Sequence, residues 1–415
     1  MPVNLALAPG LAVAGVSLST VAAGIKPDGS NDLVLICLSE TNRTAAVFTQ
    51  NAFCAAPVTL CKEYLRNNQG AVRAMLINAG NANAGTGSPG IDMARGHCQA
   101  VAGALSLGAG TVLPFSTGVI GQLLPDEKMR SGISAAARAL QDSVVTGSEA
   151  NSIEAWQSAA RGIMTTDTEP KLTSQTVVVN GQTITITGMA KGAGMIQPNM
   201  ATMLAYVFTD AAVSAADCDN ALRSAVDGSF NAITVDSDTS TNDACLLSAT
   251  GQGVALSSSD VAWPAFLDAL TTVCRDLAQA IIRDAEGASK FITVRVTGGR
   301  NTNECKTVAY AVANSPLVKT ALFASDANVG RLLMAVGKAD IDALDPAGVT
   351  INLGDLCAFQ NGGIAEGYSE KRGAEIMAKS EIDINIDLAR GDAVAEVYTS
   401  DLSHDYVSIN ADYRS

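Results

Sequence analysis

The chain has 415 residues, a formal net charge of −14, 47% apolar residues and 16% charged residues. This apolar content is sufficient for a large buried core in one domain or two lobes, and it excludes an intrinsically disordered protein. The acidic charge argues against a nucleic-acid partner, because phosphate binding requires a basic surface.

Cysteine usage and hydropathy set further limits on the class of protein. The nine cysteines are scattered and none forms a C-x-x-C pair, so we expect reduced thiols and no metal site. No apolar run approaches the roughly 20 residues that span a bilayer. Residues 1–20 lack the basic start and the continuous apolar stretch of a signal peptide. We therefore expect a cytoplasmic protein.

The predicted elements alternate between strands and helices. Short apolar runs predict strands at 33–38, 45–49, 71–77, 111–115, 173–179, 182–187, 203–208, 291–297 and 317–323. Longer amphipathic stretches predict helices at 57–67, 90–107, 126–140, 152–163, 215–226, 260–285, 306–315 and from 328 onward. Two more strands are expected to flank a short helix near 371–380. Asn180-Gly181 joins strands 173–179 and 182–187 and predicts a two-residue hairpin.

Three polar segments interrupt this pattern. The Asn- and Gly-rich segment 78–87 predicts a loop, either a tight connection or a set of amide groups that line a pocket. Strand 111–115 opens into Ser116-Thr117-Gly118, whose N–H groups and hydroxyls are the ingredients of an oxyanion hole. The acidic segment 236–243 has oxygen ligands that suit Ca²⁺ but lacks the spacing of an EF-hand, so we expect a hydrogen-bonded loop.

The rest of the chain is organised around segment 191–204, which reads Lys-Gly-Ala-Gly-Met-Ile-Gln-Pro-Asn-Met-Ala-Thr-Met-Leu. It leads through glycines and a proline to Thr202, at the start of a strand that is apolar enough to be buried on both faces. The Thr202 hydroxyl can attack the carbonyl carbon of Ala201, and water can then cleave the resulting ester. A threonine that begins a strand is also ordinary. However, the chain has only His97 and His404, which leaves little imidazole for a Ser-His or Cys-His pair.

Segment 191–204 closely resembles the self-cleavage segment of the ornithine/glutamate N-acetyltransferase family. The resemblance covers nearly the whole chain and includes segments 78–86, 116–118, 165–168, 284–288 and 410–415. Members of that family cleave themselves before the threonine and work as two α and two β chains. They transfer an acetyl group from N-acetylornithine to glutamate in arginine biosynthesis, and many are bifunctional because they also use acetyl-CoA.

The resemblance implies an α/β fold with helix, sheet, sheet and helix layers, as in N-terminal-nucleophile-like acetyltransferases and aminopeptidases, and a smaller C-terminal α/β lobe. It implies an α chain of residues 1–201, a β chain of residues 202–415 and a lobe boundary near 287–290. The chain departs from the family at Ser237, where glycine is usual, and at 326–331, which lacks the usual proline and tryptophan. These departures put peripheral structure in doubt, not the reaction.

The resemblance also implies roles for individual residues. Thr202 would be the nucleophile that accepts the acetyl group, released by cleavage between Ala201 and Thr202, and Thr117 and Gly118 would form the oxyanion hole. Substrate contacts would fall on Thr165, Lys191, Thr202, Glu286, Asn410 and Ser415, with Thr166 as an alternative to its neighbour. Lys191 suits an α-carboxylate and Glu286 an ammonium group. No cofactor is implied beyond acetyl-CoA as a co-substrate. Two rival hypotheses are an N-terminal-nucleophile amidohydrolase or aminopeptidase and an uncleaved binding protein.

Overall fold

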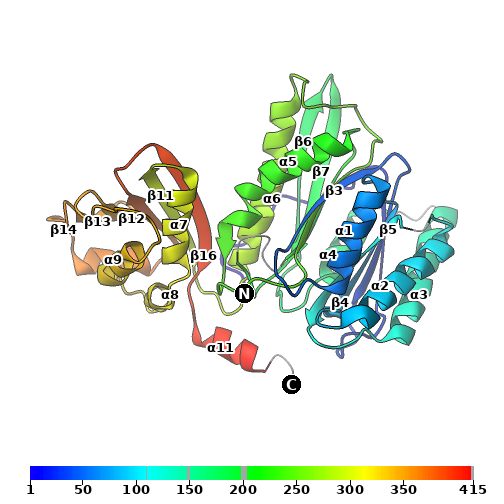
Figure 1. The fold of residues 1–415 in the computed structure, drawn as a ribbon, viewed down its shortest axis with the longest axis horizontal. Coiled ribbons are helices and arrows are strands. Elements are labelled where there is room, and N and C mark those ends of the chain that lie inside the picture. Colours follow the sequence, from blue (N-terminus) through cyan, green and yellow to red (C-terminus); the bar gives the residue numbers. More distant parts are fainter. Residues whose placement is uncertain (109, 147–149, 198–202, 413–415) are drawn as a thin grey trace.

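The computed structural model describes residues 1–108, 110–146, 150–197 and 203–412, which form three sheets with their covering helices (Figure 1). The first sheet has the order β1 (Val16–Val21), β2 (Leu33–Leu38), β4 (Ala74–Asn81) and β5 (Val112–Val119). Only its β4–β5 pair is parallel. Helices α2 (Gly87–Leu105) and α3 (Asp126–Thr146) pack on its outer face, and α1 (Ala56–Asn68) packs against β5.

The second sheet has the order β3 (Arg43–Phe48), β10 (Ala244–Ala249), β8 (Leu204–Thr209), β7 (Gln182–Lys191) and β6 (Lys171–Val179). Helices α5 (Ala215–Asp227) and α6 (Trp263–Arg283) cover its outer face, and α4 (Ile153–Gly162) packs against both β1 and β6. The layers therefore run helix, sheet, sheet and helix. This arrangement confirms the predicted fold class.

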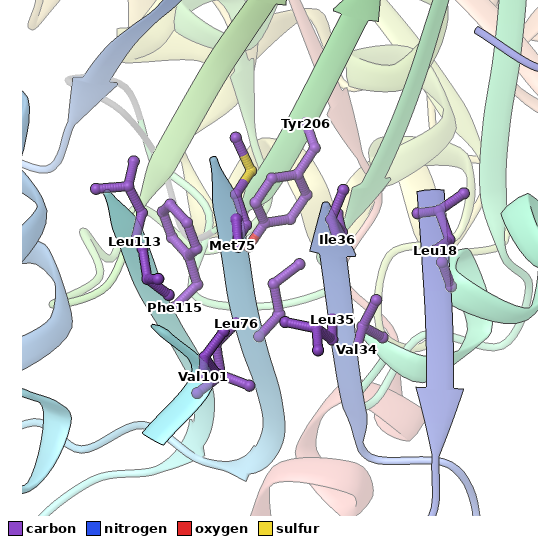
Figure 2. Packing of buried hydrophobic residues seen from close by; sticks show 14 of the residues in the cluster. Leu18, Val34, Leu35, Ile36, Met75, Leu76, Val101, Leu113, Phe115 and Tyr206 are labelled. Atoms are coloured by element: carbon purple, nitrogen blue, oxygen red, sulfur yellow. The ribbon is translucent and has the colours of Figure 1, made fainter. Parts of the chain in front are cut away.

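Strand β8 lies at the centre of the second sheet, and all six of its residues are buried. Its alternate side chains belong to two cores, as period-2 geometry requires. Tyr206 and Phe208 face the core of the first sheet. Tyr206 makes an edge-to-face contact with Phe115 on β5 at 5.2 Å between ring centroids, and Phe208 makes one with Trp156 on α4 at 5.3 Å. Figure 2 shows Tyr206 against the strands of the first sheet. Val207 packs instead with the residues of α5 and α6.

The third sheet forms the smaller C-terminal α/β lobe that was predicted, with its own apolar core. Its order is β14 (Gly363–Ile364), β13 (Leu356–Gln360), β12 (Thr350–Leu353), β15 (Glu381–Asp387), β11 (Phe291–Gly299), β16 (Ala393–Ser400) and β9 (Ile233–Thr234). The helices that follow β11 are α7 (Thr302–Ala313), α8 (Pro316–Phe323), α9 (Val329–Gly337), α10 (Glu370–Met377) and α11 (His404–Ala411). The stretch 287–290, where a lobe boundary was predicted, lies between α6 and β11.

One predicted strand is wrong. Residues 317–323 form part of helix α8, not a strand. The Ser315 hydroxyl accepts a hydrogen bond from the Val318 N–H, and Pro316 occupies the first turn, where it sacrifices no helical hydrogen bond. These start signals outweigh the apolar run that favoured a strand.

Two predicted boundaries are also corrected, and both affect the polar segments. Strand β4 continues through Asn81, so the first part of segment 78–87 is strand and not loop. Strand β5 continues past Phe115 to Val119 and includes Thr117 and Gly118. The predicted hairpin is confirmed: Asn180 and Gly181 have φ values of 53° and 78°, which suit a type I′ turn.

None of the described helices combines the length and the apolarity needed to cross a membrane. All nine cysteines are free thiols. The cleavage segment connects β7 to β8, and Lys191 pairs with Leu204 across the antiparallel ladder. The predicted cleavage site at Ala201 and Thr202 lies outside the described residues.

The Tyr206 hydroxyl provides a test of the packing between the sheets. It is buried and makes no hydrogen bond within the described part of the chain. A buried unsatisfied hydroxyl costs about 1–3 kcal/mol, so Tyr206→Phe should keep or raise the free energy of unfolding in urea. Tyr206→Ala should lower that free energy by about 3–5 kcal/mol, because the buried ring is lost and a cavity remains between the sheets. A Tyr206→Phe protein that unfolds at clearly lower urea would contradict this interpretation.

Candidate functional site

A pocket of about 250 Å³ lies where the carboxyl ends of β5 and β7 meet the segment before β10 and the segment after α6. Its lining residues are Ala82, Thr117, Gly118, Ile120, Thr165, Thr166, Lys191, Gly194, Met195, Ser240, Thr241, Asn242, Glu286 and Asn410. The structure thus brings together six predicted site residues: Thr117, Gly118, Thr165, Lys191, Glu286 and Asn410. Thr166, the predicted alternative to Thr165, lines the pocket as well. Ala201, Thr202 and Ser415 lie outside the described residues.

Gly118 shapes the wall of the pocket formed by β5. Its φ is +131°, and a Cβ atom there would lie 2.3 Å from the carbonyl carbon of Gly80 on β4. The β4–β5 register shifts at this point, between Gly80 and Asn81. Only glycine can occupy such a close backbone approach in this conformation. The glycine that the sequence suggested for an oxyanion hole therefore has a backbone reason to be there.

Buried side-chain amides hold the backbone around Thr117 and Gly118. The Asn242 amide donates to the carbonyl oxygens of Ala82 at 2.7 Å and Ser116 at 2.9 Å. The Ser116 hydroxyl donates to Asn78 Oδ1 at 2.6 Å, and the Asn78 amide donates to the Asn81 carbonyl at 2.8 Å. Within segment 78–87, Ala82 alone lines the pocket. Of the two interpretations of that segment, a structural support of the pocket wall fits better than an amide-lined surface.

Lys191 carries the positive charge of the pocket. Its side chain is 4% exposed, and Nζ donates to Thr117 Oγ1 at 3.2 Å. Burial lowers the pKa of Lys191, and the charges of Asp167 and Glu286 oppose that shift. The ammonium group therefore lies between the strand that supplies the candidate oxyanion hole and the acidic side of the pocket.

Glu286 carries the negative charge, and two neighbours fix its position. The Asn410 amide donates to Glu286 Oε2 at 2.7 Å, and the Glu286 N–H donates to the Ala193 carbonyl at 3.0 Å. A Cβ atom on Gly194 would lie 2.4 Å from Glu286 Oε2. The second glycine of the Lys-Gly-Ala-Gly run therefore makes room for this carboxylate.

The acidic segment 236–243 acts as a hydrogen-bonded loop, in line with the preferred interpretation. Asp236 accepts hydrogen bonds from the N–H groups of Met195 at 2.6 Å and Ile196 at 2.8 Å, and from the Tyr406 hydroxyl at 3.1 Å. It thereby connects the approach to the cleavage segment with helix α11, which carries Asn410. Sequence reasoning missed this role, because the three donors lie far from Asp236 in the sequence.

Asp243, at the end of the same segment, was also missed. It is 1% exposed, and Oδ1 accepts a hydrogen bond from the N–H of Met203 at 3.1 Å. Burial raises the pKa of Asp243 well above its ordinary value. This carboxyl therefore contacts the amide that follows Thr202 in the chain.

Neither histidine lines the pocket. His97 Nε2 contacts Asp126 Oδ1 at 2.9 Å, and the His404 ring packs edge-to-face on Phe323. No cluster of three or more His, Cys, Asp or Glu side chains suited to a metal ion occurs among the described residues.

The fold and the pocket define an α/β sandwich protein in which a lysine and a glutamate line the same small pocket. The chain belongs to the ArgJ family, whose sequence profile matches residues 17–415. This membership confirms the resemblance found in the sequence.

One relative matches the full length of the chain, and two solved structures each match about half of it. It is 49% identical over 419 residues to the arginine biosynthesis bifunctional protein ArgJ of Pseudomonas syringae pv. tomato, covering 100% of both chains. A solved ArgJ structure from Bacillus halodurans is 36% identical, with a TM-score of 0.48 over 50% of this chain and 98% of that chain. Ornithine acetyltransferase from Mycobacterium tuberculosis, solved with ornithine, is 34% identical, with a TM-score of 0.38 over 46% and 95% of the respective chains.

Gly118→Ala tests the backbone requirement in the pocket wall, with Gly121→Ala as a matched control. Both glycines have left-handed φ values, +131° and +86°, but a Cβ on Gly121 would meet nothing within 4 Å. Gly121→Ala should therefore cost only the conformational strain, about 1–2 kcal/mol of unfolding free energy. Gly118→Ala should cost clearly more, because β4 and β5 must separate. If urea denaturation shows that both variants lose the same unfolding free energy, the close backbone approach at Gly118 is contradicted.

Proposed function

We propose that this chain is a self-cleaving acetyltransferase of arginine biosynthesis, which transfers acetyl from N2-acetylornithine to glutamate through an acetyl ester on Thr202. The observation that carries the proposal is that Lys191 and Glu286 line the same pocket as Thr117 and Gly118. Membership of the ArgJ family supports the reaction class.

Processing comes first in the proposed sequence. The Thr202 hydroxyl attacks the Ala201 carbonyl carbon, and the bond from that carbon to the Thr202 nitrogen breaks to give an ester. Water hydrolyses the ester and leaves an α chain of residues 1–201 and a β chain that begins with Thr202. The free amine of Thr202 then serves as the base for its own hydroxyl.

Acetyl transfer follows in two steps, and both use the hydroxyl oxygen and the free amine of Thr202. The Thr202 oxygen attacks the acetyl carbonyl of acetylornithine, the amide C–N bond breaks, and the ornithine nitrogen leaves with the proton that the hydroxyl gave up. Glutamate then attacks the ester through its amine, and the Thr202 oxygen recovers a proton. Thr117 and Gly118 stabilise the negative oxygen of both tetrahedral intermediates.

The pocket charges orient the substrate. Lys191, with the Thr165 hydroxyl, binds the α-carboxylate, and Glu286, held by Asn410, binds the side-chain ammonium of ornithine. Ser415 is proposed as a further contact. Hydrogen bonds that involve a charged group contribute about 1.5–3 kcal/mol each, so two of them select strongly for a zwitterion.

The assembly is proposed to contain two α and two β chains and to work in the cytoplasm without a cofactor. Whether acetyl-CoA also serves as donor is decided by glutamate acetylation assays with acetyl-CoA as the sole acetyl source. The alternative function, an N-terminal-nucleophile amidohydrolase, would release more free acetate than acetylglutamate when both substrates are present.

The processing step predicts two chains by intact-mass analysis, with the second beginning at Thr202. Thr202→Ala should give one uncleaved chain, because it removes the attacking oxygen. Thr202→Ser keeps a hydroxyl and serves as the control, which should still be cleaved. Two chains from the Thr202→Ala protein would refute the mechanism.

The pocket charges predict a selective effect on binding. Lys191→Ala and Glu286→Gln should each raise the KM for acetylornithine about 10- to 150-fold, because each removes one charge-assisted contact worth about 1.5–3 kcal/mol. Glu381→Gln is the control. Glu381 pairs with Arg283 at 3.0 Å outside the pocket, so the KM of the Glu381→Gln enzyme for acetylornithine should equal that of the wild type. Wild-type KM values in both pocket variants would remove these residues from the substrate site.

A further inference from the structure

Behind the pocket lies a buried cluster of one lysine between two aspartates. Lys171 Nζ contacts Asp167 Oδ1 at 2.7 Å and Asp284 Oδ2 at 2.7 Å, and all three side chains are at most 1% exposed. A buried ion cluster often stabilises a fold no better than apolar residues would. Its presence beside a ligand pocket therefore calls for a reason other than stability.

The two aspartates make different contacts. Asp167 accepts hydrogen bonds from the N–H groups of Gly192 at 2.7 Å and Thr165 at 3.1 Å. Thr165 lines the pocket, and Gly192 lies between the pocket residues Lys191 and Gly194. One carboxylate thus ties together two separate segments of the pocket wall.

Asp284 is bonded to a different segment. It accepts from the N–H and the hydroxyl of Thr168 and from the N–H of Glu169. Asp284 and Thr168 line a neighbouring cavity and do not line the pocket. The two carboxylates share the same cation and the same burial, but only Asp167 contacts the backbone on both sides of the pocket.

We propose that Asp167 is a positioning residue of the site: it fixes the backbones of Thr165 and Gly192, and its negative charge favours the protonated form of the buried Lys191. Asp284, by contrast, only neutralises Lys171 and anchors Thr168. That Lys191 receives a substrate carboxylate rests on the proposed function. The positioning of Lys191 by Asp167 rests on the contacts and charges alone.

The charges around Lys191 agree with this division. Burial lowers the pKa of Lys191, and Asp167 opposes this most strongly, followed by Glu286 and Asp243, whereas Lys171 adds to the lowering. Asp284 does not contribute to the shift as strongly as these groups do. Asp243 is a weak counter-charge, because burial keeps its own pKa well above the ordinary value. Burial alone would raise the pKa of Asp167, but the ammonium groups of Lys171 and Lys191 and the Gly192 N–H hold it below the ordinary value.

The matched pair Asp167→Asn and Asp284→Asn tests the proposal without a ligand. Both should lower Tm at neutral pH, because each removes one carboxylate from Lys171. Only Asp167→Asn should move the pKa of Lys191 clearly further down, because it removes the negative charge that most strongly opposes the effect of burial. Folded Lys191 then loses its proton at a lower pH than Lys191 in the unfolded chain, so stability rises with pH between the folded and the unfolded pKa of this lysine.

We therefore expect Tm to rise more steeply with pH in Asp167→Asn than in Asp284→Asn or the wild type. The excess slope should vanish when Lys191→Met is added. Equal slopes in the two asparagine variants would overturn the proposal. If either single variant fails to fold, two double variants replace them: Lys171→Met/Asp167→Asn and Lys171→Met/Asp284→Asn. Each removes one positive and one negative charge from the cluster, and their slopes of Tm against pH allow the same comparison.

Enzyme kinetics give a second readout. The alkaline rise in KM for acetylornithine should begin at a clearly lower pH in Asp167→Asn, with kcat changed far less, and should not move in Asp284→Asn. A wild-type protein that transfers no acetyl would count against the proposed function, while the Tm slopes would still decide the role of Asp167.

Discussion

The burial of the Lys191 ammonium group is the constraint on which the rest of the site depends. An amine taken out of water tends to lose its proton unless fixed negative charges surround it. The chain supplies these charges from two distant parts of the sequence, Asp167 before β6 and Glu286 after α6. Each carboxylate is in turn held by backbone or amide donors, so that the pocket walls and the pocket charges form one connected network.

The four-layer fold makes this network rigid. Strand β7 delivers Lys191 to the end of the second sheet, and β5 brings Thr117 and Gly118 to the adjacent end of the first sheet. Because Tyr206 and Phe208 pack the two sheets against each other, the distance between these strand ends is set by the core. Lys191 and Thr117 thus lie at the buried ends of two strands, and helix α11 supplies one side chain from near the chain end.

Most of the pocket could be predicted from the sequence, because its residues lie in the long motifs that carried the family resemblance. The supporting residues could not: Asp167 and Asp236 act through backbone N–H groups of segments that are distant in sequence. No local pattern states where such donors will lie.

The third sheet was only partly predicted for a related reason, since its edge strand β9 comes from residues 233–234, far from the other strands. The error at 317–323 arose because an apolar run of that length suits either a short helix or a strand.

The strand order of the second sheet has a consequence for a cut between residues 201 and 202. Strands β3, β6 and β7 precede that point and β8 and β10 follow it, yet the order in the sheet is β3, β10, β8, β7 and β6. The two fragments are therefore interleaved, with β8 and β10 inserted between strands of the other fragment. Dissociation would have to open two complete strand ladders and expose both cores. A protein divided in this way would unfold and dissociate in the same event, so its midpoint of thermal unfolding would rise with protein concentration after the cut but not before it.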